Sequence, residues 1–213
     1  MNTSSEPARP MRPALSRKFI LQTALRIVDS EGPTKLTMRR LGAELGVDPM
    51  AVYHYLPNKT ALFDGITEAI WTSLDLDGID PAGTWQQQLA ATMHALRGTL
   101  RAHPRAIAIL GTRPVASPEL FTLLDRMLGI LIDAGMPANG DTADLLNTLV
   151  TYTIGHVLAE VGEPIGGQTV PPTYQTLTPQ THPNLAAVLN NGWTCDPDSQ
   201  YERGLNALLN GWR

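Results

Sequence analysis

The sequence predicts an all-α protein, in which a three-helix N-terminal unit is joined by a fourth helix to a larger helical domain. Apolar residues recur at helical spacing, as in the stripe formed by Leu21, Ala24, Leu25 and Val28. Glycine and proline separate the apolar stripes from one another. The sequence shows no strand pattern, internal repeat or low-complexity tract. These observations together favour a chain built from helices alone.

Composition limits the classes of protein to consider. The chain has 213 residues, of which 43% are hydrophobic, enough for a small unit plus a second domain with its own core. The single cysteine, Cys195, cannot form an internal disulfide, which fits a reducing cytosol. No apolar stretch approaches the roughly 20 residues needed to cross a bilayer, and the first 15 residues lack the apolar segment of a signal peptide. We therefore expect a cytoplasmic protein with no membrane partner.

The net charge of −4 is distributed unevenly. Residues 1–60, here called the head, hold nine Lys and Arg against five Asp and Glu, which gives 9 − 5 = +4. The remainder, here called the body, holds seven against fifteen, which gives −8, and it has no lysine. Although solvated faces also produce such asymmetry, a basic head on an acidic body suggests that only the head contacts phosphate.

Capping residues divide the head into short helices. Ser16 caps the first, which Gly32 and Pro33 end. Thr37 caps a second that ends at Gly46. Asp48 caps the third helix, Pro49 stands at its first position, and Pro57 ends it after about two turns. Asn58 caps the fourth, which runs from Lys59 to about Leu74.

The second and third of these helices have the pattern of a helix-turn-helix, in which a tight turn containing glycine joins two short helices. The second helix of that motif projects side chains from its N-terminal part into the DNA major groove. Here that helix is predicted at residues 49–56, with Val52 and Leu56 facing the core. We therefore predict a DNA-binding domain over residues 16–62, after a disordered N-terminal arm at residues 1–15.

The motif LTMRRLGAELGVDPMAVYHYLPNKTALFDGI, residues 36–66, resembles the DNA-binding segment of the TetR family of repressors. Gly42 and Tyr55 differ from the residues most usual in the family, alanine and phenylalanine, without weakening the match. The resemblance implies a double-stranded DNA operator as partner. It also implies the following DNA-binding residues: Thr37, Arg39, Pro49, Met50, Ala51, Tyr53, His54, Tyr55 and Lys59.

These positions differ in what they could recognise. Met50 and Ala51 can contact only thymine methyl groups, so Arg39 is the best candidate for reading guanine. Tyr53 and Tyr55 have the alternative of being core aromatics. Arg40 fits a solvated or helix-pairing role better than base recognition.

The body is predicted to continue as helices after a linker at residues 75–83. A segment rich in Gly, Pro, Thr and Gln at residues 163–183 is predicted to be a long exposed loop. The predicted helices span residues 85–102, 104–110, 118–134, 141–160, 184–190 and 198–212. Residues 63–213 would thus form a ligand-binding and dimerisation domain.

Three stretches of the body resemble the tetracycline repressor branch of the same family: LGTRP at residues 110–114, YTIGHVLAE at 152–160 and YERGLNALLNG at 201–211. The resemblance implies a small-molecule effector. Its implied ligand-binding residues are Thr92, Leu96, Ile109, Arg113, Met127, Thr151 and Tyr152, and Trp193 of the partner subunit would join them. For each of these a core or bracing role is the alternative.

Two positions depart from that branch. The histidine that binds the drug's magnesium is Ile109 here, and the supporting acidic residue is Ala159. Neither side chain offers the oxygen or nitrogen ligand that a hard cation needs. We therefore expect no metal site, no cofactor, and an effector other than a metal–tetracycline complex.

The resemblance also implies a homodimer, in which helices 141–160 and 198–212 of two chains form a four-helix bundle. Its seam is expected from six residues: Leu145, Leu149, Ile154, Leu205, Leu208 and Leu209. The expected function is a repressor released from a palindromic operator by a small-molecule inducer, and not an enzyme. The alternative is a DNA-binding regulator that senses no small molecule or acts through a protein partner.

Overall fold

The computed structural model describes residues 14–76, 78–113, 117–164, 167, 177–193 and 195–212. Over these residues the regular elements are all helices, which confirms the predicted all-α fold. The predicted arm, apart from residues 14 and 15, and much of the predicted loop at 163–183 lie outside the described residues. The elements in chain order are α1 (Arg17–Glu31), α2 (Met38–Leu45), α3 (Pro49–Tyr53), α4 (Lys59–Thr72), α5 (Trp85–Ala102), the 3₁₀ helix η1 (Pro104–Ala106), α6 (Ile107–Thr112), α7 (Pro118–Asp133), α8 (Gly140–Val161), α9 (Pro183–Asn190) and α10 (Pro197–Gly211).

The helices of the head begin where the capping residues predict. The side chains of Ser16, Thr37, Asp48 and Asn58 each accept a hydrogen bond from a backbone N–H in the first turn of the helix that follows. Gly46 adopts a left-handed conformation, with φ of 69°, in the turn between α2 and α3. The backbone can therefore reverse tightly there and place α3 across α2.

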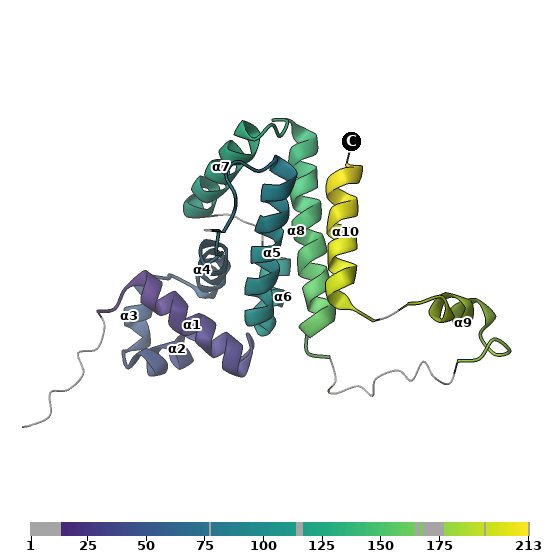
Figure 1. Cartoon of the computed structure of the whole chain (residues 1–213). Helices are drawn as coiled ribbons and strands as arrows, with labels where there is room; N and C mark the ends of the chain where they lie inside the picture. Colours follow the sequence, from purple (N-terminus) through teal and green to yellow (C-terminus); the bar gives the residue numbers. More distant parts are fainter. Residues whose placement is uncertain are drawn as a thin grey trace, which may run out of the picture.

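Helix α4 connects the head to the body (Figure 1). Its residues Leu62, Ile66 and Ile70 are fully buried. At Gly65 the helix passes so close to α1 that an added Cβ would lie 2.5 Å from a methyl carbon of Leu21. Because α1 and α4 are packed this closely, we expect a movement of α4 to carry α1 with it.

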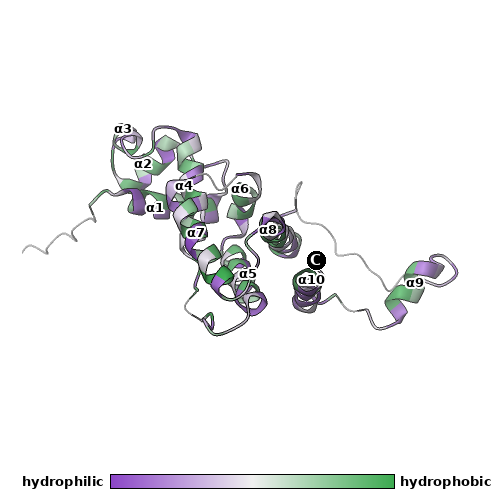
Figure 2. Cartoon of the chain, turned by 90° about the horizontal axis from the view of Figure 1, so that it is seen from above, coloured by the Kyte–Doolittle hydropathy of each residue, from purple (hydrophilic) through white to green (hydrophobic). Residues whose placement is uncertain are grey.

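The body is built around α5, α8 and α10, with α7 packed against α4 and α5 (Figure 2). Its core comes from inward-facing residues of these helices: Leu89, Leu96 and Leu100 of α5, Leu145, Leu149 and Val157 of α8, and Tyr201, Leu205 and Leu209 of α10. At Gly204 an added Cβ would lie 2.1 Å from the hydroxyl oxygen of Tyr152. A side chain at this position would force the Tyr152 ring to move, so glycine permits the close approach of α10 to α8.

A buried charge cluster ties the same three helices together. Arg97 of α5 donates to Glu160 of α8 at 2.9 Å and to Asp198 of α10 at 2.6 Å. Its guanidinium also lies 4.6 Å from the centre of the Tyr201 ring. The Arg97 and Glu160 side chains are 8% and 9% exposed, so each is the other's buried partner, while the more exposed Asp198 and Arg101 complete the cluster.

Helix α9 lies apart from the other helices, beyond α10 (Figure 1). Its Leu185 and Val188 are exposed, as is Trp193 after it. Within the described part of the chain, no helix is long and apolar enough to span a membrane.

Several helices differ from their predicted bounds by one or two residues, as α4 does in ending at Thr72 and not at about Leu74, and two others differ further. The predicted helix at residues 49–56 ends at Tyr53, because the chain turns at His54 before it reaches Pro57. The predicted helix at residues 104–110 is a 3₁₀ turn followed by α6, which continues through Gly111 to Thr112.

The expected dimer seam is also wrong for four of its residues. Leu145, Leu149, Leu205 and Leu209 are at most 4% exposed within the single chain. They form part of its own core and are not available to a second copy.

Candidate DNA interface and effector cavity

The face of α3 and its following turn presents most of the side chains predicted to meet DNA. Met50 is 64% exposed, and Tyr53, His54 and Tyr55 are also exposed. Val52 is fully buried, and it anchors the helix on the head core. Ala51 is half-buried and Pro49, likewise half-buried, occupies the first helical position.

Tyr55 has a second role within the head. Its hydroxyl donates to the backbone carbonyl of Leu15 at 3.0 Å, so it joins the turn after α3 to the start of α1. A side chain held in this way has less freedom to reach a phosphate than Tyr53, whose hydroxyl forms no hydrogen bond with another described residue of the head. Tyr53 is therefore the stronger of the two candidates for DNA contact.

Thr37 and Arg39 lie at the start of α2, and both are exposed. The Thr37 hydroxyl accepts from the Arg40 N–H at 3.0 Å. Arg40 is bound to Glu31 and to Glu44, each at 2.7 Å, and these carboxylates raise the pKa of its guanidinium. Arg40 therefore pairs α2 with the end of α1, the helix-pairing role that the sequence favours for it.

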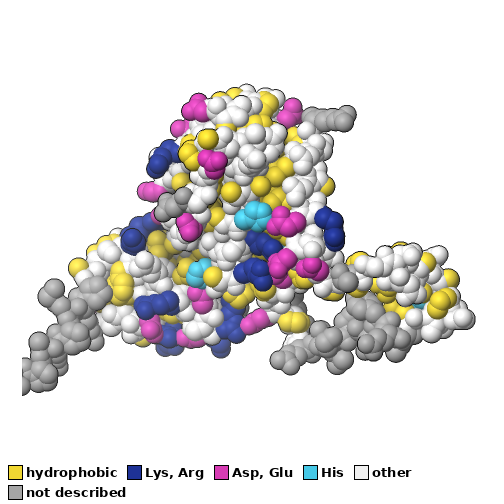
Figure 3. All heavy atoms as spheres, in the orientation of Figure 1, with side chains coloured by type: hydrophobic (Ala, Val, Ile, Leu, Met, Phe, Trp, Pro, Cys, Tyr) yellow, Lys and Arg dark blue, Asp and Glu magenta, His cyan; other side chains and the backbone are white. Residues whose placement is uncertain are grey.

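Five cations of the described head form no ion pair there and remain available to phosphate: Lys18, Arg26, Lys35, Arg39 and Lys59. Lys59 stands at the first position of α4, with its ammonium 5.5 Å from the Phe63 ring centre. Lys and Arg side chains, with some acidic ones between them, lie along the lower edge of the head in Figure 3. Such a surface suits the backbone of duplex DNA.

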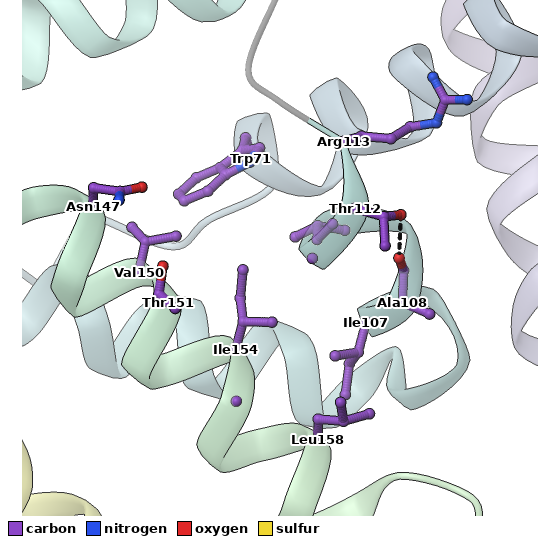
Figure 4. A pocket seen from close by; sticks show the side chains of 13 residues that line it. Trp71, Ile107, Ala108, Thr112, Arg113, Asn147, Val150, Thr151, Ile154 and Leu158 are labelled. Atoms are coloured by element: carbon purple, nitrogen blue, oxygen red, sulfur yellow. Dashed lines mark hydrogen bonds between the residues drawn. The ribbon is translucent and has the colours of Figure 1, made fainter. Parts of the chain in front are cut away.

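A cavity of about 660 Å³ lies between α4, α6 and α8, and we call it the main cavity (Figure 4). Trp71 points into it from α4, opposite Val150 and Ile154 of α8. Thr112, Asn147 and Thr151 supply its polar groups. Apolar walls with a few polar groups are the usual composition of a small-molecule site.

Arg113 lines the main cavity, but its guanidinium points away from it (Figure 4). The guanidinium is bound to the carboxylate of Asp64 and lies 3.4 Å from the carbonyl oxygen of Thr60, both in α4. Its carbon is 5.5 Å from the Phe63 ring centre. These contacts join the end of α6 to α4, the helix that connects the head to the body.

The other residues predicted to bind ligand do not surround a single cavity. Thr151 lines the main cavity, whereas Thr92 and Met127 line a smaller one of about 160 Å³ between α5 and α7. Ile109 borders a shallow hollow beside Phe63. Leu96 is fully buried in the core.

Tyr152 is engaged with α10 inside the chain. Its hydroxyl donates to the carbonyls of Gln200 and Tyr201, at 3.2 and 3.1 Å, and its ring stacks on that of Tyr201 with centroids 5.5 Å apart. Burial raises the pKa of this phenol. In the single chain Tyr152 therefore packs helices and lines neither cavity.

Sequence reasoning did not identify several residues of the main cavity, among them Trp71, Asn147, Gly155 and Leu158. Trp71 follows Ile70 at the end of the apolar stripe of α4. Its large side chain is the feature of the sequence that could have indicated a place in the cavity wall. The other three lie about two turns and then one turn apart along α8, a spacing that sequence alone does not distinguish from a core face.

Known protein families match both the head and the body of the chain. Residues 20–66 match the family described as bacterial regulatory proteins of the tetR family. Residues 78–213 match the tetracyclin repressor-like C-terminal domain. The chain belongs to the TetR family of transcriptional regulators.

Full-length relatives support the assignment. The chain is 31% identical to the class C tetracycline repressor protein of Escherichia coli over 204 residues, which cover 92% of the chain and 90% of the relative. A possible TetR family transcriptional regulator from Streptomyces coelicolor A3(2) is 30% identical, with a TM-score of 0.72 and coverage of 92% and 98%. The resemblance of both the head and the body to TetR regulators is thus confirmed.

A further solved structure shows a TetR-family protein with a bound molecule. ActR of Streptomyces coelicolor, in complex with actinorhodin, is 25% identical to the chain. Its TM-score is 0.75, and the match covers 93% of this chain and 96% of ActR.

Proposed function

We propose that this TetR-family regulator is a repressor that binds a palindromic operator as a homodimer and is released by a small-molecule effector. One observation carries the proposal: α4 is a wall of the main cavity and also part of the core of the head. Trp71 of α4 faces the cavity, while Leu62 and Gly65 of the same helix pack in and against the head. A molecule that displaces Trp71 would therefore act on the DNA-binding unit directly.

The contact of Arg113 with Asp64 provides a second mechanical link. It joins the cavity-lining end of α6 to the first half of α4 through an ion pair that is partly shielded from solvent, with side chains 26% and 42% exposed. An effector that moves the end of α6 would break or strain this contact. Through either link, a bound effector would change the position of the head. In a dimer, both heads must match the two half-sites of the operator at the same time.

An open edge of the body supports the proposed dimer. Helices α8 and α10 lie side by side, and no described helix packs on their outer side (Figures 1 and 2). The residues of these two helices that are exposed in the single chain include Ala207 of α10 and, on α8, Thr151, Gly155 and Leu158, which also line the main cavity. A second copy related by a two-fold axis would complete a four-helix bundle and place two recognition helices about 34–36 Å apart.

The effector would differ from a metal–drug complex. Ile109 and Ala159 provide no ligand for a hard cation. The main cavity is lined mostly by apolar side chains and its polar groups are uncharged apart from Arg113, which is bound to Asp64. These walls favour an apolar molecule with a few hydrogen-bonding groups.

The DNA role is tested by selecting bound sequences from random duplexes and measuring affinity for the selected site as a function of salt. Lys59→Ala should weaken binding to all sequences and reduce the slope of log affinity against log salt by about 1. Tyr53→Ala should also weaken binding. Arg40→Ala is the matched control, since its charge is already paired, and it should leave the slope unchanged.

Two results would contradict the proposal. The DNA role fails if both Tyr53→Ala and Lys59→Ala bind the selected site like the wild type. The effector role fails if compounds that enter the main cavity, as judged by crystallography, leave operator binding unchanged.

A further inference from the structure

The C-terminal end of α1 gathers negative charge that the helix itself does not compensate. Asp29 and Glu31 lie in its last turn, where the helix dipole is also negative, and that turn holds no basic residue. The last carbonyl groups of a helix also lack partners within it, so they need donors from elsewhere. The compensating groups must therefore come from other elements of the chain.

Two residues of the body supply donors to this end of α1. Arg105 of η1 donates through Nη1 to the carbonyl oxygens of Asp29 and Ser30, at 3.2 and 2.5 Å. His103, which follows α5, has its Nδ1 2.9 Å from Oδ2 of Asp29. Because an ionised carboxylate can only accept, Nδ1 carries the proton of this bond. We call these contacts of His103 and Arg105 with the end of α1 the α1 junction.

The α1 junction is also held on the body side. Arg105 is bound at 2.7 Å to the carboxylate of Glu163, two residues after α8, so its guanidinium reaches from α1 to the end of α8. The next residue, Ala106, is fully buried and fixes η1 on the core. Oδ1 of Asp29 is buried and accepts no hydrogen bond from a described residue, so this carboxylate depends on its bond to His103.

The α1 junction reaches the head through α1 and not through α4. Arg40 of α2 binds Glu31 at the end of the same helix, so α2 and the turn that leads to α3 follow the end of α1. On the body side, η1 continues directly into α6, whose first residue, Ile107, lines the main cavity. The orientation of α3 relative to the body therefore depends on the α1 junction as well as on α4.

We propose that His103 and Arg105 are positioning residues that hold each head of the dimer at the half-site spacing of the operator. Two recognition helices bind one palindrome together only when their separation matches that of the half-sites. With the α1 junction intact, a head has little freedom to follow a half-site that is displaced along the DNA. Without it, the head would be held through α4 and would adapt to a wider range of spacings. The inference rests on the proposed function, because it assumes a dimer and a palindromic operator.

The test varies the spacing of the half-sites, with the full-length protein. It compares the selected palindrome, the same palindrome with one or two base pairs inserted at its centre, and a single half-site. One inserted base pair moves a half-site by about 3.4 Å along the DNA axis and rotates it by roughly 35°. Arg105→Met keeps the apolar stem and removes the donors and the charge. Arg101→Met is the matched control, because Arg101 pairs with Glu160 and Asp198 of the body and not with α1.

For the wild type, one inserted base pair should lower the affinity by about 100-fold, because only one half-site can then be engaged. In Arg105→Met this loss should shrink to about tenfold or less, while affinity for the single half-site stays within about threefold of the wild type. Arg101→Met should show the wild-type loss. His103→Phe breaks the other bond with a ring of similar shape, and it should reduce the loss by at least about threefold. It decides the question should Arg105→Met fail to fold.

The inference is overturned if Arg105→Met, or His103→Phe in its place, loses as much affinity on insertion as the wild type does. It is also overturned if affinity for the single half-site falls in parallel with that for the palindrome, since this would show damage to the head itself. A wild type that binds the spaced palindromes as well as the selected one contradicts the proposed dimer and operator, and the inference falls with them. The wild-type measurement thus separates failure of the proposed function from failure of the inference.

Discussion

Replacement of Arg97 by methionine tests how the body holds its three central helices together. Methionine retains most of the apolar stem but leaves the Glu160 carboxylate, 9% exposed, without its buried partner. Removing one member of a buried pair costs about 3–5 kcal/mol. Arg101 remains 3.2 Å from Glu160, so the lower end of that range, about 3 kcal/mol, applies. Asp198 is 66% exposed and adds less than about 1 kcal/mol.

The assay is equilibrium denaturation at a fixed protein concentration, together with thermal melting. At about 2–4 °C per kcal/mol for a chain of this size, Arg97→Met should lower Tm by about 6–12 °C. Arg101→Met, whose side chain is 46% exposed, is the control and should cost less than about 1 kcal/mol. Adding Glu160→Gln to Arg97→Met should recover at least about 1 kcal/mol, because it removes the uncompensated charge.

The reasoning would be refuted by either of two results. One is a loss in Arg97→Met no greater than that in Arg101→Met. The other is a double variant no more stable than Arg97→Met alone, which would show that the buried carboxylate is not the source of the loss.

Two further predictions concern the contacts around α10. Gly204→Ala should destabilise the fold by about 1–3 kcal/mol, because its Cβ would meet the Tyr152 hydroxyl, whereas Gly98→Ala in the open space beside α5 should stabilise it by about 0.5–1 kcal/mol; equal melting temperatures for the two variants would contradict this. Burial and the nearby Arg97 cation lower the pKa of His156 below its ordinary value of 6.5. The stability it contributes is therefore complete above about pH 6.5 and is lost as the pH falls through its folded value, so His156→Gln should flatten the decline of denaturation free energy from pH 7 to pH 5. A wild-type slope in that variant would show that other groups cause the decline.

The helices were predictable from sequence because their signals are local. Thr37 and Asn58 each cap a helix through a bond to a backbone N–H three residues away. The predicted helix at residues 85–102 coincides with α5 (Trp85–Ala102). In contrast, Pro57 did not mark the end of α3, since nothing in the sequence shows that the turn begins at His54.

The effector site was less predictable because it depends on which faces meet. Leu145 and Leu205 have the apolar spacing of a dimer seam and equally of an internal core, and they occupy the internal core. Arg113 was identified as a cavity residue, but its bond to Asp64 joins segments that are 49 residues apart. The buried Oε1 of Gln88 has no hydrogen-bond partner among the described residues because of the orientation of one side chain relative to the linker, which no periodicity records.

The central claim is that occupancy of the main cavity weakens operator binding through α4. It is tested most directly by measuring operator affinity with and without a saturating compound that crystallography places against Trp71. We predict a loss of operator affinity of about 10- to 100-fold, and an equal loss of compound affinity when operator is bound, because coupling is reciprocal. A compound that fills this cavity and leaves operator affinity unchanged would contradict the claim.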